Sequence, residues 1–110
     1  MRLAVVGSRN LGNISIGDYI KWSVDEIVSG GAVGVDNCAA EYARANNIRL
    51  IEFLPKYDRY GRVAPLVRNK EIVNYADYVI VFWDGISKGT LSVIKYAQSV
   101  GKPCEIIICK

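Results

Sequence analysis

Two short apolar segments place the strongest limits on the fold of this chain. Residues 78–83 read YVIVFW and residues 3–6 read LAVV. A strand with one face in water would alternate apolar and polar residues, so unbroken runs of this length are typical of strands that are covered on both faces. We therefore predict a parallel sheet buried between layers of helices, with 78–83 at an interior position.

The rest of the chain alternates between strand and helix patterns. Further strands are predicted at 26–29, 49–54 and 104–109, and helices at 36–46, from Pro65 to about Tyr75, and at 90–100. Residues 18–23 could form a short helix, residues 55–61 have the composition of a loop, and Leu66, Val73 and Ala76 are expected to face inward. The alternation predicts an α/β fold: one small doubly wound Rossmann-like domain over 1–110, with about five mostly parallel strands and helices on both faces.

Composition excludes several kinds of chemistry. The 110 residues include no histidine, which removes nucleophiles activated by imidazole and zinc sites built on histidine. The three cysteines form no CxxC pair, so we expect buried small side chains and no metal site. No apolar run approaches the roughly 20 residues of a membrane span, and we expect a cytoplasmic protein without a membrane partner.

Three glycine-containing loops should meet at one edge of the sheet, because every loop that follows a parallel strand lies at the same edge. They are 7–10, 30–36 and 84–90. Glycine lets backbone N–H groups face a concavity, and each loop leads toward a helix N-terminus with partial positive charge. The arrangement predicts a site for an anion, most naturally a phosphate.

Side chains in and near these loops could complete such a site. Ser8 and Thr90 offer hydroxyl groups, and Arg9, Arg68 and Lys88 offer cations for a phosphate or a carboxylate. A possible wall for an adenine ring is formed by Tyr57, Tyr60 and Trp83. Together these features predict a nucleotide pocket.

A purely structural interpretation stands beside each of these features. Single glycines such as Gly7, Gly30 and Gly89 can serve tight turns, and Asp36 can be an ordinary residue of a helix N-terminus. A lone Arg68 is more often solvated than bound to a ligand, and Trp83 more often belongs to a core. The coincidence of three loops at one edge favours the functional interpretation.

The common nucleotide motifs are absent. The chain contains neither the P-loop pattern GxxxxGK[ST] nor the dinucleotide pattern GxGxxG. Its glycine-rich GGAVG segment follows the second predicted strand instead of the first. An ordinary NAD-dependent dehydrogenase is therefore not expected.

An ordered set of short motifs nevertheless resembles a known superfamily. The chain contains GSR at 7–9, SGGAVGVD at 29–36, RN at 68–69, Asp77 before an apolar strand, and GT at 89–90. This order is similar to the SLOG superfamily, most closely to its small stand-alone branch of YspA/YpsA-related proteins. The resemblance covers nearly the whole chain and implies a Rossmann-like sheet that binds nucleotides or nucleotide-derived ligands.

The resemblance also implies which residues line the pocket. They are Gly7, Ser8, Arg9, Gly31, Gly34, Asp36, Arg68, Asn69, Gly89 and Thr90. The loops add Gly30, Asp84, Gly85 and Lys88 to the candidates. Thr90 is expected to cap the helix that follows it, and self-association into a homo-oligomer is implied as well.

Two branches of the superfamily suggest alternatives. LOG phosphoribohydrolases cleave the N-glycosidic bond of nucleoside monophosphates with an arginine, which Arg68 could represent, and a glutamate. Val93 stands where that glutamate is expected, so Asp84 or Asp36 would have to supply the carboxylate. DprA proteins bind single-stranded DNA, but Val33 replaces the arginine of their loop, which makes a nucleic-acid partner less favoured.

The sequence thus predicts a small-molecule nucleotide partner, such as AMP or ADP-ribose, bound by a protein that acts more as a sensor than as an enzyme. No further cofactor is implied. Hydrolysis of an N-glycosidic bond and binding of single-stranded nucleic acid remain the alternatives.

Overall fold

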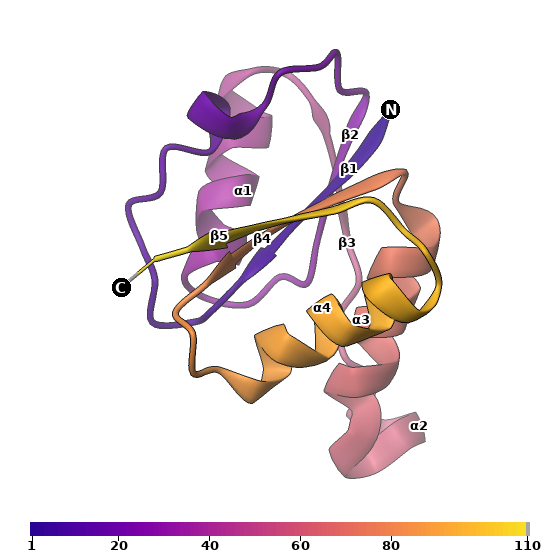
Figure 1. Ribbon diagram of the computed structural model, residues 1–110. Helices are drawn as coiled ribbons and strands as arrows, with labels where there is room; N and C mark the ends of the chain where they lie inside the picture. Colours follow the sequence, from indigo (N-terminus) through magenta and orange to yellow (C-terminus); the bar gives the residue numbers. More distant parts are fainter. Residues whose placement is uncertain (110) are drawn as a thin grey trace.

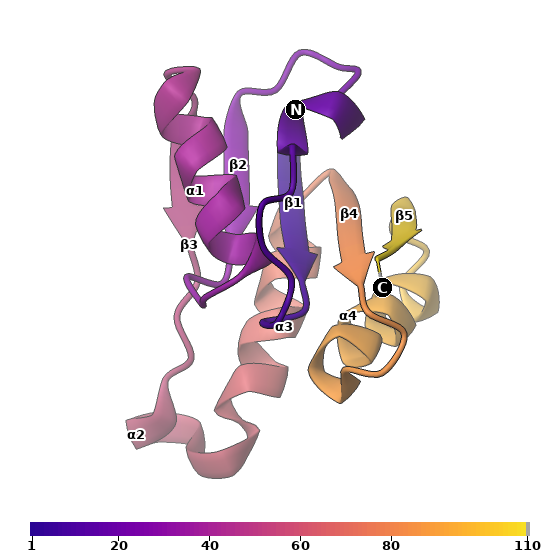
Figure 2. The same ribbon diagram turned by 90° about the vertical axis from the view of Figure 1, so that its left-hand side faces the viewer.

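The computed structural model describes residues 1–109 and contains a five-stranded parallel sheet in the order β3-β2-β1-β4-β5. The strands are β1 (Arg2–Gly7), β2 (Glu26–Ser29), β3 (Arg49–Glu52), β4 (Tyr78–Trp83) and β5 (Cys104–Ile108). Helix α1 (Val35–Ala45) covers one face, and α3 (Ala64–Tyr75) and α4 (Lys88–Ser99) cover the other (Figures 1 and 2). The predicted Rossmann-like α/β fold is confirmed.

Strands β1 and β4 have unbroken apolar sequences because both faces of each strand are buried. Leu3 and Val5 of β1 pack in the core beneath α1, while Ala4 and Val6 pack in the core beneath α3 and α4. Strand β4 divides its side chains between the same two cores. Burial of both faces stabilises each strand without any alternation of polarity, as expected for parallel sheets.

Several predictions about single helices and strands, or about where they end, are wrong. Residues 18–23 do not form a helix; the irregular connection from β1 to β2 holds one turn of 3-10 helix at Ile16–Tyr19. Residues 55–61 contain a helical turn, α2 (Tyr57–Tyr60), which continues through a 3-10 turn at Gly61–Val63 into α3. The third and fifth strands end at Glu52 and Ile108, earlier than predicted.

Burial corrects two further expectations. Leu66 faces solvent and is 45% exposed, because it lies on the outer side of α3, whereas Val73 and Ala76 are buried as predicted. The three cysteines are half-buried at the margins of the core and form no disulfide. Among residues 1–109 no helix is long and apolar enough to cross a membrane, and no cluster of acidic or cysteine side chains could hold a metal ion.

The chain order of the strands positions the functional edge. From β1 the chain proceeds outward to β2 and β3, and then returns across the sheet to β4 on the other side of β1. The strand order therefore reverses at β1, and ligands of open α/β sheets bind at the carboxyl ends of strands beside such a reversal.

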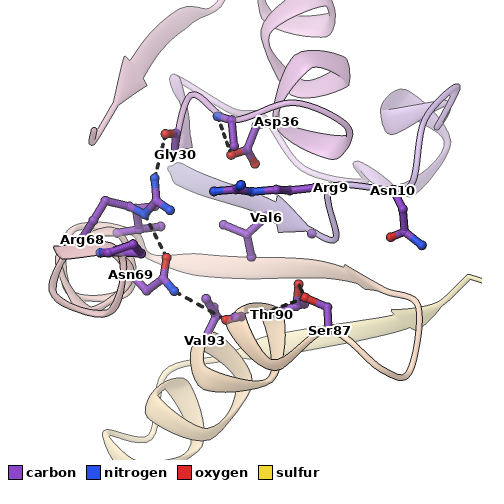
Figure 3. Close-up of a pocket in the computed structure, with 15 residues that line it drawn as sticks. Val6, Arg9, Asn10, Gly30, Asp36, Arg68, Asn69, Ser87, Thr90 and Val93 are labelled. Atoms are coloured by element: carbon purple, nitrogen blue, oxygen red, sulfur yellow. Dashed lines mark hydrogen bonds between the residues drawn. The ribbon is translucent and has the colours of Figure 1, made fainter. Parts of the chain in front are cut away.

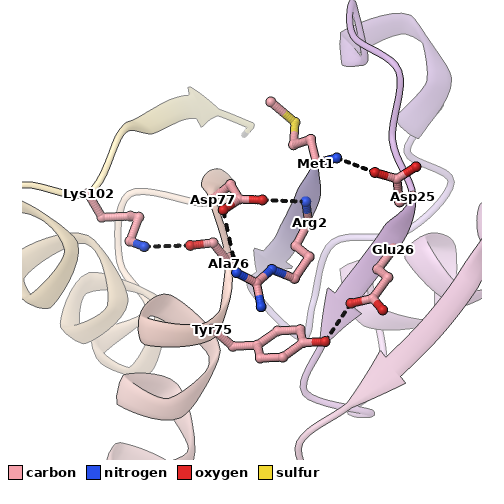
Figure 4. Close-up of polar contacts among 8 residues, drawn as sticks. All are labelled: Met1, Arg2, Asp25, Glu26, Tyr75, Ala76, Asp77 and Lys102. Carbon is pink, nitrogen blue, oxygen red and sulfur yellow. Dashed lines mark hydrogen bonds and ion pairs between the residues drawn. The ribbon is translucent and has the colours of Figure 1, made fainter.

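The opposite edge, at the amino ends of the strands, is closed by polar contacts (Figure 4). The backbone N–H of Arg2 donates to Asp77 Oδ2 at 2.8 Å, and the Arg2 guanidinium lies 3.7 Å from Asp77 Oδ1. Tyr75 donates its hydroxyl to Glu26, and Lys102 donates to the carbonyl of Ala76. The charged side chains at this edge thus have partners within the protein, and Arg2 and Asp77 are paired with each other.

Candidate functional site

A cavity of about 420 Å³ opens at the carboxyl edge of the sheet. It is lined by residues from the loops after β1, β2 and β4 and by one face of α3. The lining residues are Val6, Gly7, Arg9, Asn10, Gly30, Ala32, Asp36, Pro65, Arg68, Asn69, Ile72, Ser87, Gly89, Thr90 and Val93 (Figure 3). The three predicted loops do meet at one rim, and the volume lies in the range of small-molecule sites.

Arg68 is a buried side chain of the cavity that is fixed by several hydrogen bonds. It is only 8% exposed. Its Nε donates to Asn69 Oδ1 at 2.9 Å, and its Nη1 donates to the carbonyl oxygens of Gly30 at 2.8 Å and Phe53 at 3.3 Å. Arg68 is therefore not the solvated charge that its position in the sequence alone would suggest.

The second terminal nitrogen of Arg68 has no partner within residues 1–109. Nη2 makes no hydrogen bond within residues 1–109, and none of the fully buried polar side-chain atoms there lacks a partner. Nη2 must therefore reach open space, and Arg68 lines the cavity. Burial lowers the pKa of Arg68, and the nearby positive charge of Arg9 lowers it further, while Asp36 raises it.

Arg9 approaches the same space from the loop after β1. Its side chain crosses the cavity with the guanidinium directed toward the side formed by Gly30 and Arg68 (Figure 3). It is exposed and forms neither an ion pair nor a hydrogen bond through its side chain within residues 1–109. Two guanidinium groups therefore face one cavity, which favours an anionic guest.

Asp36 brings the opposite charge to the cavity. It lies in the first turn of α1, is 7% exposed, and accepts a hydrogen bond from the Ala32 N–H at 3.0 Å through Oδ2. Burial raises the pKa of Asp36, against the lowering effects of the Ala32 hydrogen bond, the charge of Arg68 and the Gly30 N–H. Asp36 and Arg68 form no ion pair with each other within the described chain.

Gly30 is required between these two side chains. A Cβ at Gly30 would lie 2.5 Å from Arg68 Nη1 and 3.1 Å from Asp36 Oδ2. Any larger residue would displace the guanidinium from the Gly30 carbonyl. The absence of a side chain at this position thus allows the buried arginine and the buried aspartate to flank the same loop.

Other predicted residues hold the loops together instead of lining the cavity. Ser8 is buried; its Oγ lies 3.3 Å from Thr90 Oγ1 and accepts from the Asp84 N–H at 3.3 Å. Gly34 has a φ of 78°, and a Cβ there would lie 2.5 Å from the Arg9 carbonyl oxygen, so the loops after β1 and β2 pack closely at this point. Both residues are structural in this arrangement.

In the loop after β4, several backbone N–H groups donate hydrogen bonds to side chains of the same loop. Asp84 Oδ1 accepts from the N–H groups of Ile86 and Ser87 at 2.9 and 2.8 Å, and these bonds lower the pKa of Asp84. Ser87, and not Thr90, is the N-cap of α4, since its Oγ accepts from the Thr90 N–H at 3.4 Å. The N–H groups of Ile86, Ser87 and Thr90 are therefore engaged within the loop. The N–H groups of Lys88 and Gly89, in the first turn of α4, have no partner within residues 1–109, and Gly89 lines the cavity, so anion binding by this backbone stays a prediction.

Four other candidates lie outside the lining of the cavity. Gly31, Asp84, Gly85 and Lys88 do not line it. The three proposed wall residues also lie elsewhere: Trp83 donates its Nε1 to the Ser87 carbonyl, and Tyr57 is 56% exposed on α2. The apolar walls are instead formed by Val6, Pro65, Ile72 and Val93.

A periodic signal in the sequence could have found part of the missed lining. Pro65, Arg68, Asn69 and Ile72 have the spacing i, i+3, i+4, i+7, so all four lie on one face of α3. Because Arg68 and Asn69 were already candidates, this spacing could have predicted that Pro65 and Ile72 also line the cavity. No comparable signal exists for Asn10 or Ala32, whose positions depend on irregular loops.

No protein-family model matches this chain, and no curated protein matches it either.

Proposed function

We propose that the cavity binds a nucleotide or nucleotide-derived ligand whose phosphate lies between Arg9 and Arg68. The observation that carries the proposal is a buried arginine fixed by three hydrogen bonds, with one nitrogen free to donate, opposite a second arginine without a partner. Such a pair matches the oxygen atoms of a phosphate. The order of motifs shared with the SLOG superfamily supports the same ligand class.

The rest of the cavity suits the remainder of a nucleotide. Pro65 is half-exposed and offers apolar surface to a base, above the buried side chains of Val6, Ile72 and Val93. Asn69 holds Arg68 and, through Nδ2, donates to Ser92 Oγ at 3.1 Å, which ties α3 to α4. Asn69 is thus a positioning residue for the phosphate-binding arginine.

Calorimetric titration with AMP, ADP-ribose and adenosine tests this proposal. AMP and ADP-ribose should bind, and adenosine should bind at least about tenfold more weakly because it lacks the charge-assisted hydrogen bonds. Arg9→Ala should weaken AMP binding by about tenfold without affecting the fold, since Arg9 has no partner in the protein. Arg62→Ala, an exposed arginine outside the cavity, is the matched control.

Arg68→Ala should abolish measurable binding of AMP. Arg68→Lys keeps the positive charge but lacks the several N–H donors of the guanidinium, so it should not restore full binding. Thermal melting of each variant separates loss of binding from loss of folding. Failure of every nucleoside phosphate, NAD and cyclic nucleotide to bind at millimolar concentration would overturn the proposal.

A second candidate is hydrolysis of the N-glycosidic bond. It is favoured by the presence of a carboxylate, Asp36, in the same cavity as Arg68. Asp84 is unsuited to that role because its carboxylate is bound by its own loop. Incubation with AMP should release free adenine if the candidate is right, and Asp36→Asn should stop the release; recovery of intact AMP would exclude it.

Self-association is supported by exposed apolar residues on the projecting segment around α2 (Figure 2). They are Leu54, Tyr57, Val63 and Leu66. Contact between copies through this surface would remove these side chains from water. Sedimentation across a range of concentrations tests it: Leu66→Glu should shift the protein toward the monomer, and a wild-type chain that is monomeric throughout would contradict it.

A further inference from the structure

The Asp36 carboxylate has one oxygen that the protein does not use. Oδ2 accepts from Ala32 at 3.0 Å and the Gly30 N–H also favours the charged carboxylate, while no hydrogen bond to Oδ1 forms within residues 1–109. Since none of the fully buried polar side-chain atoms lacks a partner there, Oδ1 reaches open space although the residue is 93% buried. In Figure 3 the carboxylate points toward the space crossed by Arg9.

No side chain of the protein forms an ion pair with this carboxylate, although the charge of Arg68 acts on it at longer range. Arg68 is fixed by Gly30, Phe53 and Asn69, and Asp36 is fixed by Ala32, so neither side chain can move to the other without breaking hydrogen bonds. A buried, unpaired carboxylate is costly. A ligand that donates a hydrogen bond to Asp36 and accepts one from Arg68 would satisfy both buried side chains.

This combination narrows the ligand class. Inorganic phosphate satisfies the arginines and is repelled by Asp36, whereas a neutral sugar leaves the arginines without a partner. A phosphorylated ribose offers both an anionic group and hydroxyl donors, and acidic side chains are known partners of ribose hydroxyls.

We propose that Asp36 makes the cavity selective for ribonucleotides over deoxyribonucleotides, by accepting a hydrogen bond from a ribose hydroxyl while Arg9 and Arg68 hold the phosphate. The inference rests on the proposed nucleotide function and names a specificity-determining residue for it. A site built to hydrogen-bond a hydroxyl group discriminates strongly against the analogue that lacks it, because its own polar atom is then left unpaired.

The test compares AMP with its 2′-deoxy, 3′-deoxy and 2′,3′-dideoxy analogues by calorimetry on the wild-type chain. We expect the dideoxy analogue, and at least one of the monodeoxy analogues, to bind about tenfold or more weakly than AMP. In Asp36→Asn this ratio should fall to within about threefold, because the charge-assisted hydrogen bond is lost. Asp58→Asn, on the exposed α2, should keep the wild-type ratio.

The outcomes separate the two proposals. Equal binding of AMP and all its deoxy analogues by the wild type would overturn the ribose inference and leave nucleotide binding intact. Retention of the wild-type ratio in folded Asp36→Asn would also overturn it. Absence of binding by AMP itself would overturn the proposed function. The wild-type comparison stands even if the variant fails to fold.

Discussion

The two edges of the sheet use charged residues in opposite ways. At the amino edge, Arg2 and Asp77 lie 3.7 Å apart, and a backbone hydrogen bond of 2.8 Å joins the same two residues (Figure 4). At the carboxyl edge, Arg68 and Asp36 flank Gly30 without pairing. The first pair is half-exposed and the second is more than nine-tenths buried.

The difference distinguishes an edge whose contacts serve folding from the edge at which we propose that a ligand binds. An exposed ion pair contributes little to stability and needs no further partner. Buried charges that stay apart are costly, and a fold retains them when a ligand completes them. The unpaired charges therefore identify the carboxyl edge more strongly than its glycine content does.

The largest change should come from Gly30→Ala, which breaks the arrangement at the carboxyl edge. The new Cβ would lie 2.5 Å from Arg68 Nη1, so the guanidinium must leave the Gly30 carbonyl. We expect destabilisation on the order of 2–3 kcal/mol by urea unfolding, together with loss of AMP binding.

Gly89→Ala is the matched control for stability, because open space surrounds a Cβ there and the residue lies within α4. It should keep or raise the free energy of unfolding, by up to about 1 kcal/mol. Equal effects of the two substitutions would mean that Arg68 is not constrained by Gly30.

A smaller loss is expected from Ser8→Ala. The hydroxyl group links the loops after β1 and β4 through Asp84 and Thr90, and it is buried. Its removal leaves the Asp84 N–H without that acceptor and should cost about 1–2 kcal/mol. Ser99→Ala, which removes an exposed hydroxyl at the end of α4, should change stability by less than about 0.5 kcal/mol. Similar losses in both variants would argue against the buried link.

Much of the fold was predictable because it follows from periodic patterns. The apolar runs of β1 and β4 and the helical spacing in α1 are local signals, and the convergence of three loops follows from the parallel sheet. The meeting of Arg9, Asp36 and Arg68 at one cavity could be predicted from the same patterns. Each of these residues lies in or next to a helix or strand whose direction in the sheet the pattern determines.

What the sequence could not show was the partner of each polar group. Asp84 and Asp36 are both acidic residues of glycine-containing loops, yet one binds its own loop and the other leaves an oxygen open. Ser8 resembles a phosphate donor and instead links two loops. These differences depend on loop geometry at the scale of a single hydrogen bond, which composition and spacing do not specify.

A pH titration of stability sharpens the contrast between the two aspartates. The folded pKa of Asp36 is raised by burial, so the folded state binds more protons than the unfolded state, and stability falls as the pH rises from about 4 through the folded pKa. Asp36→Asn removes this fall. Its free energy of unfolding relative to the wild type should increase from acid to neutral pH in urea unfolding series, and a constant difference would contradict the assignment.

Asp77→Asn should show the opposite and smallest effect. The backbone N–H and the charge of Arg2 lower the pKa of Asp77, so the ionised carboxylate stabilises the fold above the unfolded value near pH 4, and this contribution is lost as the pH falls through the folded pKa. The variant should therefore be less stable than the wild type at neutral pH and equal to it in acid. Because the pair is exposed, added salt should reduce the difference by screening. A salt-independent difference, or one with the same sign of pH dependence as Asp36→Asn, would show that the two edges do not differ as their contacts indicate.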